Sequence, residues 1–158
     1  MGLGNCLIAA AYGHLHIFEY LVEREYNEYN ELACACAALK GHLNCLKYLH
    51  EDVKAPWDSK TAYRAAEYGH LHILEYLVER EYDHFAELAC TYAAESGHLN
   101  CLKYFHEVAK APWDSRAVKR AHACDSLQCL QYLLDNDCPL PDGWRYESGT
   151  LHVPQEDA

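Results

Sequence analysis

Apolar and polar positions follow each other along this chain with the spacing of an α-helix. In the segment LHILEYLVE at 71–79, Leu71, Leu74, Leu77 and Val78 lie at i, i+3, i+6 and i+7, and polar residues fall on the other face. This spacing gives a helix one continuous apolar stripe. The segment therefore predicts an amphipathic helix with one face against a core.

A second helix is predicted directly before it, in the stretch SKTAYRAAEYGH at 59–70. The pair Asp58-Ser59 is a helix start signal. The small residues Ala65 and Ala66 allow a neighbouring helix to approach closely. Gly69 is expected to end the helix, since glycine tolerates the left-handed conformation found there. The pattern thus predicts a helix, a tight turn, a second helix and a short loop.

This unit is repeated along the chain. A Gly-His pair begins at positions 13, 41, 69 and 97, which gives a constant 28-residue period, and one further step reaches Asp125-Ser126, where the pattern continues without Gly-His. The chain also contains a longer, 56-residue repeat, because residues 9–64 and 65–120 are identical at 39 of 56 positions. Five units are predicted, at about 3–30, 31–58, 59–86, 87–114 and 115–142, followed by an acidic tail at 143–158.

A single helical pair cannot bury its apolar face, whereas stacked pairs bury it together. Stacking predicts core positions that recur with the period of the unit. Such columns are Leu15, Leu43, Leu71, Leu99 and Leu127; Phe18, Leu46, Leu74, Leu102 and Leu130; Tyr20, Tyr48, Tyr76, Tyr104 and Tyr132; and Ile17, Cys45, Ile73, Cys101 and Cys129. The loops repeat an aromatic residue that is expected to cover the seam between pairs: Tyr29, Trp57, Phe85 and Trp113.

The segment AAEYGHLHILEYLVE resembles the core of the ankyrin repeat, Ala-Ala-x-x-Gly-His-Leu-x-x-Val/Leu-x-x-Leu-Leu, and five copies extend this resemblance over residues 3–142. GHLNCLKYLHE followed by APWDS is similar to a short ankyrin variant of large DNA viruses and some protists. The resemblance implies an all-α, ankyrin-like solenoid of helical hairpins. It also implies that the Gly-His imidazoles bond backbone groups of the adjacent unit. Because the period is 28 and the usual period is 33, the β-hairpin fingers are expected to be shortened or absent.

The net charge of −11 argues against binding to nucleic acid or to an anionic membrane surface. No apolar run approaches the ~20 residues that span a bilayer, and the first residues lack the basic start of a signal peptide. The nine cysteines predict reduced thiols in the cytoplasm, which is the host cell cytoplasm if the chain is viral.

Metal binding is the main chemical alternative. Cys34, Cys36, His42 and Cys45 carry ligand groups, but the chain has no Cys-x-x-Cys pair, and the cysteines recur in phase with the repeat. Small core residues explain that phase. No catalytic motif is present, so neither a cofactor nor an enzymatic activity is expected. A metal-dependent enzyme stays open as the remote alternative.

The resemblance implies a non-catalytic protein–protein interaction module that binds through the concave face of inner helices and loops. Its positions here are Tyr12, Leu39, Lys40, Glu67, Tyr68, Glu95 and Ser96. Of the 17 differences between the two 56-residue blocks, 13 fall in the inner helices or in the loops leading into them. A recognition surface predicts this pattern, and so does drift of a tolerant surface. Two further alternatives are a substrate-recognition adaptor of a larger assembly, such as a ubiquitin ligase, and a self-associating structural module.

An acidic column on the second helices predicts a partner with a basic patch, or serves solubility alone: Glu23, Glu51, Glu79, Glu107 and Asp135. The two ends of the stack differ. Lys119, Arg120 and His122 are expected to give the fifth unit a polar outer side, with Trp144 folded back over it and the rest of the tail frayed. The first unit has no charged residue before Glu19, which predicts that its apolar end is covered by a second copy of the chain or by another protein, unless it frays or continues a longer array.

Overall fold

The computed structural model of the chain describes residues 2–24, 31–82 and 87–154. These residues are mostly helical, as the sequence predicts, and the helices follow each other in pairs. The pairs are α1 (Gly2–Tyr12) and α2 (Leu15–Glu23); α3 (Glu31–Lys40) and α4 (Leu43–Glu51); α5 (Ser59–Glu67) and α6 (Leu71–Glu79); α7 (Glu87–Glu95) and α8 (Leu99–Tyr104), which continues as the π-helical turn η1 (Phe105–Ala109); and α9 (Ser115–Ala123) and α10 (Leu127–Asp135). A short hairpin of β1 (Arg145–Glu147) and β2 (Thr150–His152) follows.

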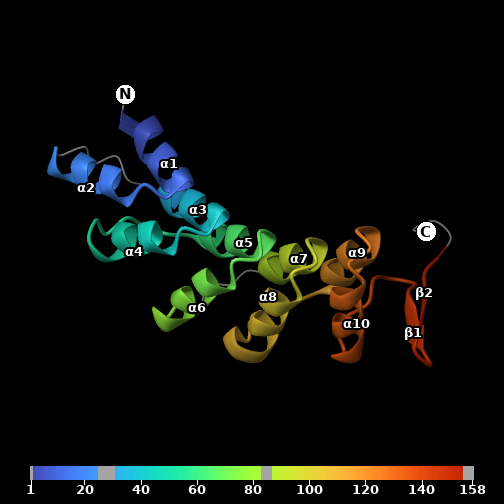
Figure 1. Cartoon of the computed structure of the whole chain (residues 1–158). Helices are drawn as coiled ribbons and strands as arrows, with labels where there is room; N and C mark the ends of the chain where they lie inside the picture. The colour runs from blue at the N-terminus through green and yellow to red at the C-terminus, as the bar shows by residue number, and fades with distance from the viewer. Residues whose placement is uncertain (1, 25–30, 83–86, 155–158) are drawn as a thin grey trace.

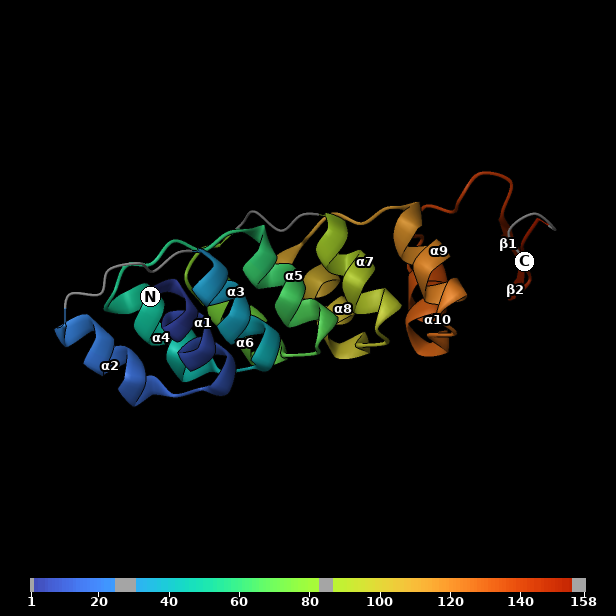
Figure 2. The same cartoon turned by 90° about the horizontal axis from the view of Figure 1, so that it is seen from above.

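The pairs stack in the order of the sequence. Each odd-numbered helix packs against the next odd-numbered helix, from α1 to α9. Figure 1 shows these inner helices on the inner side of a curved stack, and the even-numbered outer helices fan out on the other side. In the view from above, the turns within the pairs lie along one edge (Figure 2). No described helix is both long and apolar enough to cross a bilayer.

Local sequence sets the helix ends. Asp58 and Asp114 precede α5 and α9, and each carboxylate accepts a hydrogen bond from a backbone N–H in the first turn, at 2.9 Å. Such caps satisfy a donor that the helix itself leaves unpaired. At the other end, Gly69 has a φ of +75°, and its N–H bonds the Ala66 carbonyl. The predicted start and stop signals of the third unit are therefore confirmed.

Small residues let the inner helices approach closely. Ala65 and Ala66 are fully buried, and so are the alanines at the equivalent positions of the first, second and fourth units. On the outer helices, the columns of Phe18 and Ile73 are buried through all described units except for the half-buried Ile17. The interior is thus continuous from the first helical pair to the last.

Two predicted core columns are less buried than expected. The tyrosine column ranges from Tyr76, at 2% exposed, to Tyr20, at 53%. In the leucine column that begins at Leu15, the first four members pack partly against the core, but Leu127 is 69% exposed. In the described chain, α10 is followed by the β1–β2 hairpin and not by a sixth helical pair. The prediction of a core residue at Leu127 is wrong.

The segment after α10 is ordered in the described chain through residue 154, so the expectation that it frays is wrong there. Strands β1 and β2 pair antiparallel, with Tyr146 opposite Leu151. Ser148 and Gly149 both have positive φ, as tight two-residue hairpin turns require. Trp144 is only 4% exposed and presents its ring edge to His122, with ring centroids 5.0 Å apart. Trp144 therefore folds back over the last pair, as predicted, but the hairpin was not foreseen.

Candidate functional site

The residues predicted to bind a partner lie at the ends of the inner helices, next to the Gly-His turns. Tyr12 and Tyr68 are well exposed, at 69% and 47%, and Lys40 and Ser96 are exposed as well. The side chains of Leu39, Glu67 and Glu95 are half-buried. All seven positions therefore reach the surface of the inner-helix side, although three of them offer only part of their side chains.

Backbone carbonyls at three of these positions hold the next unit in place. The imidazoles of His70 and His98 donate from Nε2 to the carbonyls of Leu39 and Glu67, at 3.1 Å in each case. In the fifth unit the Ser126 hydroxyl donates to the Glu95 carbonyl at 3.0 Å. Since a carbonyl oxygen only accepts, Nε2 carries the proton in each imidazole.

The same bond joins His42 to the Ala11 carbonyl at 3.2 Å, so the expected bonding of the histidines to the adjacent unit is confirmed for His42, His70 and His98. His14 belongs to the first unit, and its ring stacks on Tyr12, with ring centroids 6.1 Å apart. Burial lowers the pKa of His70 below its ordinary value, which favours the neutral ring.

Each of these imidazoles also lies against the glycine of the preceding turn. A Cβ atom at Gly69 would lie 2.6 Å from Nδ1 of His98, and one at Gly41 would lie 2.8 Å from Cε1 of His70. The glycine therefore serves two purposes, because it supplies the positive φ of the turn and leaves room for the next imidazole. The repeated pair is one device that joins consecutive units.

A recess opens between the inner helices α7 and α9, and we call it the α7–α9 recess. Its volume is about 500 Å³. Its lining includes Leu88, Tyr92, Glu95, Arg116, Lys119 and Arg120. Only Glu95 belongs to the predicted set. The prediction that Lys119 and Arg120 lie on the outer side of the last unit is wrong, because both line the recess beside α7.

Aromatic and charged side chains continue from the recess toward α5. Tyr92 stacks on Tyr63 of α5, with ring centroids 5.1 Å apart. The Arg64 guanidinium lies over the Tyr63 ring at 5.3 Å and pairs with Glu67 at 2.6 Å. Ion pairs of this kind are partly exposed and contribute little to stability. Arg64 can therefore exchange the carboxylate of Glu67 for that of a ligand.

Three members of the acidic column accept hydrogen bonds within the described chain: Asp135 from Gln131 in the same helix, and Glu51 and Glu107 from the next unit. The Tyr76 hydroxyl donates to Glu51 at 2.9 Å, and Arg80 donates to the same carboxylate at 2.6 Å. The hydrogen bond from Tyr76 has the larger effect and that from Arg80 the next, and both lower the pKa of Glu51. The equivalent Tyr132 hydroxyl donates to Glu107 at 2.8 Å. Both carboxylates therefore join consecutive units.

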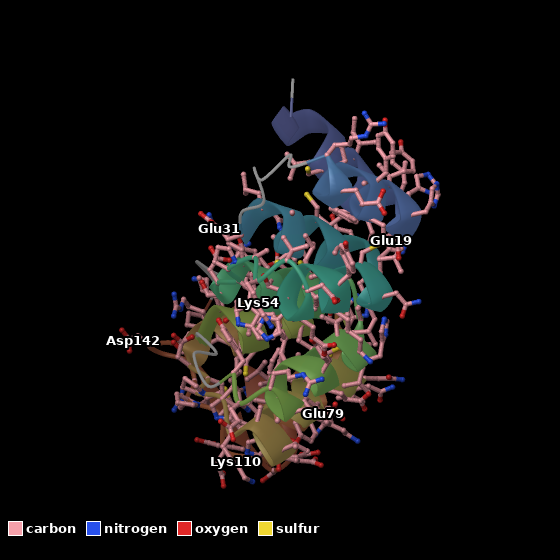
Figure 3. All side chains as sticks on the ribbon, turned by 90° about the vertical axis from the view of Figure 1, so that its left-hand side faces the viewer. Glu19, Glu31, Lys54, Glu79, Lys110 and Asp142 are labelled. Atoms are coloured by element: carbon pink, nitrogen blue, oxygen red, sulfur yellow. The ribbon has the colours of Figure 1, made fainter. Side chains whose placement is uncertain are left out.

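The other members of the acidic column also lie on the outer helices. Glu79, on the outer helix α6, is exposed and is labelled in Figure 3. Its role as a surface for a basic partner stays a prediction, and Glu51 and Glu107 have the structural role described above as well.

An aromatic cluster lies beside each of the two tyrosine–glutamate bonds, from Tyr76 to Glu51 and from Tyr132 to Glu107. The His50 ring stacks on Trp57, with centroids 3.7 Å apart, and Tyr76 meets Trp57 edge-on at 6.0 Å. The equivalent cluster, two units further along the chain, consists of His106, Trp113 and Tyr132. The predicted role of the two tryptophans at the seams is confirmed, whereas Tyr29 and Phe85 lie outside the described residues.

The residues considered for metal binding do not form a site. Cys34 is buried, and burial raises the pKa of its thiol to about 12, so it stays protonated at neutral pH. The His42 ring bonds the Ala11 carbonyl. Within residues 2–24, 31–82 and 87–154, no three His, Cys, Asp or Glu side chains converge as metal ligands do.

The first unit carries exposed apolar residues at the open end of the stack. Ile8 is 55% exposed and lies one turn before Tyr12 on α1, whereas Leu7 is half-buried. The side chain of Leu3 lies outside the described residues. Self-association through this unit stays a prediction.

Comparison of the chain with models of known protein families and with curated proteins gave no match.

Proposed function

We propose that this chain is an ankyrin-type repeat protein of the short, 28-residue variety, and that it binds another protein in the cytoplasm without catalysing a reaction. The binding surface is the inner-helix face, from Tyr12 on α1 to the α7–α9 recess. Cysteines that are free throughout the described chain fit a reducing compartment.

One observation carries the proposal: the two 56-residue blocks differ mainly on the inner-helix side. Cys36, Leu39 and Lys40 of the first block are replaced by Tyr92, Glu95 and Ser96 in the second, and all six side chains are at least partly exposed. The outer helices, the glycines and the bonded histidines are nearly unchanged between the blocks. A fixed scaffold with one varied face is the arrangement that recognition requires.

The scaffold also suits recognition in energetic terms. The inner helices are held by buried alanines and by the His–carbonyl bonds, so their exposed side chains are presented on rigid elements. Because these elements are already rigid, this chain loses little conformational entropy when a partner binds. Exposed tyrosines are common anchors of protein interfaces.

The test compares two tyrosines of similar exposure on opposite faces. Tyr68 lies at the end of α5 on the inner face and is 47% exposed, whereas Tyr20 lies on the outer helix α2 and is 53% exposed. A partner identified by cross-linking in the native host is titrated against the purified variants. Tyr68→Ala is expected to weaken binding at least tenfold, with a nearly unchanged Tm, and Tyr20→Ala is expected to leave the affinity unchanged.

An equal loss in both variants, or no loss in Tyr68→Ala, would contradict binding through the inner face. Unfolding of Tyr68→Ala would show that this residue belongs to the core.

A further inference from the structure

The charges of the α7–α9 recess run against the charge of the whole chain. The chain has a net charge of −11. The recess is lined by three cations, Arg116, Lys119 and Arg120, and by one carboxylate, Glu95. A concave surface with a local excess of positive charge concentrates anionic groups, even on an acidic protein.

The three cations belong to α9 alone. They lie at positions i, i+3 and i+4 of that helix, so they share one face. The equivalent positions of α7 hold Leu88, Thr91 and Tyr92. Since α9 packs against α7, the basic face of one helix lies next to the largely apolar surface of the other.

The described ion pairs of Arg116 and Arg120 do not close the recess. Arg120 contacts Glu95 at 3.4 Å, and Arg116 contacts Asp114 at 2.6 Å. The side chains of the two arginines are 59% and 51% exposed, so both pairs are open to solvent. Exposed pairs contribute about 0–1 kcal/mol, and a ligand carboxylate can replace either partner at small cost.

A second basic strip lies on the opposite side of α7. The inner helix α5 carries Lys60 and Arg64, whose side chains are 48% and 38% exposed, and both pair with carboxylates of this chain, Lys60 with Asp58 at 3.7 Å and Arg64 with Glu67 at 2.6 Å. Such exposed pairs can exchange these carboxylates for those of a ligand at small cost. Along the inner face the order is therefore basic on α5, apolar on α7 and basic on α9. Leu88 and Tyr92 form the apolar middle, and Leu88 is 39% exposed.

We propose that the inner face across α5, α7 and α9 binds an extended acidic segment of a partner protein, with an apolar side chain seated in the α7–α9 recess between two acidic groups. This proposal rests on the proposed function and specifies the partner. Packed helices lie about 8–10 Å apart, so α5 and α9 are about 16–20 Å apart. An extended chain rises about 3.3 Å per residue, which places the two acidic groups about five or six residues apart.

A peptide suits this surface better than a nucleic acid. The basic strips are separated by an apolar helix, and the rest of the molecule is strongly acidic, which repels a long phosphate backbone. The recess holds Tyr92, Arg116 and Arg120, and tyrosine and arginine are enriched among the anchor residues of protein interfaces. A short acidic segment meets the basic strips without extending over the acidic outer helices.

The experiment selects peptides from a displayed library of random dodecapeptides against the immobilised full-length chain. Enriched peptides are synthesised, and their Kd is measured by fluorescence anisotropy in low and moderate salt. The expected peptides carry Asp or Glu on both sides of a Leu, Phe or Tyr, and their affinity falls as salt rises. Enrichment of basic peptides, or of none, would overturn the proposal.

Variants then locate the binding site. Lys119→Gln with Arg120→Gln is expected to weaken the selected peptides at least tenfold. Arg145→Gln, an exposed arginine on β1 outside the recess, is the matched control and is expected to leave Kd within twofold. Circular dichroism and Tm confirm that each variant is folded. Arg120→Lys keeps the positive charge, so it is expected to retain part of the affinity that the double variant loses. An unchanged Kd in the double variant contradicts the proposal.

Two further outcomes separate this proposal from the proposed function. If Tyr68→Ala weakens the natural partner and the double variant does not, the inner face binds proteins but the acidic-segment proposal fails. If neither variant matters, both fail. A single-stranded oligonucleotide that binds as tightly as the selected peptides, and is lost in the double variant, would replace the peptide by a phosphate backbone and overturn the proposal.

Discussion

The turn of the fifth unit and the turns of the units before it reach the same hydrogen bond with different side chains. At Gly69-His70 and Gly97-His98, a glycine with positive φ is followed by an imidazole that bonds the preceding unit. At Asp125-Ser126, a non-glycine residue has a φ of +52°, and a hydroxyl makes the bond. The carbonyl position and the direction of the bond are kept, so the bond matters more than the ring that usually makes it.

The comparison also separates the two purposes of the glycine. Gly69 faces the ring of His98, whereas Gly97 faces the smaller Ser126, whose Oγ would lie 3.5 Å from an added Cβ. Both glycines have a φ of +75°. The two positions therefore share the backbone requirement and differ only in the space that the next unit leaves.

The largest expected effect comes from adding a methyl group at each of these glycines. Gly69→Ala should lower the free energy of unfolding by about 2–4 kcal/mol, because backbone strain adds to a clash with the His98 ring. Gly97→Ala should lower it by only about 1 kcal/mol, from strain alone. Urea unfolding followed by circular dichroism measures both. Equal losses would show that the close approach of the imidazole does not matter.

A smaller effect of opposite sign is expected at the fifth turn. Asp125→Gly should raise the free energy of unfolding by about 0.5 kcal/mol, because relief of ~1–2 kcal/mol of left-handed strain exceeds the entropy that glycine adds to the unfolded chain. Ala123→Gly, two residues earlier at the end of α9, is the control. It should be destabilising by about 0.5–1 kcal/mol. A destabilised Asp125→Gly would mean that the Asp125 side chain stabilises this turn.

The smallest expected effect is a dependence of stability on pH. The pKa of His70 is lowered, mainly by burial, below the value of about 6.5 for an unfolded chain. Above pH 6.5 both states are neutral and stability is complete. As the pH falls through 6.5 the unfolded state binds protons first, so stability falls until the folded pKa is passed.

The measurement is Tm at pH 7.5 and 5.5. His70→Gln, which keeps a donor, should show a smaller fall than the unaltered chain, and a residual fall is expected because the pKa of His50 is lowered as well, mainly by burial. The exposed His152 on β2 provides the control variant, His152→Gln, which should behave like the unaltered chain. If Tm falls by the same amount in His70→Gln and in the unaltered chain, His70 does not contribute to the pH dependence of stability.

Sequence periodicity predicted what the units share. The helical pairs, the Gly-His turns and the buried alanines recur from unit to unit at one fixed spacing, so each is supported by several copies. Where a residue has no copy, the prediction had no support. The hairpin after Trp144 lies outside the repeat, and its two short strands carry few residues from which a pattern could be read.

Errors in the candidate site have a related cause. Lys119 and Arg120 differ from their counterparts in every other unit except at Arg64, and in the sequence alone this difference suggests a terminal unit. Lys119 and Arg120 follow Arg116 by one turn and share its helix face, and the structure shows that this face lines the recess beside α7. The seven predicted positions rested on a family resemblance, which locates a face but does not show where that face is hollowed.

The aromatic clusters give the chain its own optical probes. The three tryptophans lie at three different seams: Trp57 between the second and third units, Trp113 between the fourth and fifth, and Trp144 under the terminal hairpin. Each is at least half-buried against aromatic rings of a neighbouring element. Opening of one seam would change the emission of one indole, so variants that keep a single tryptophan would show whether the stack melts as one body or from one end.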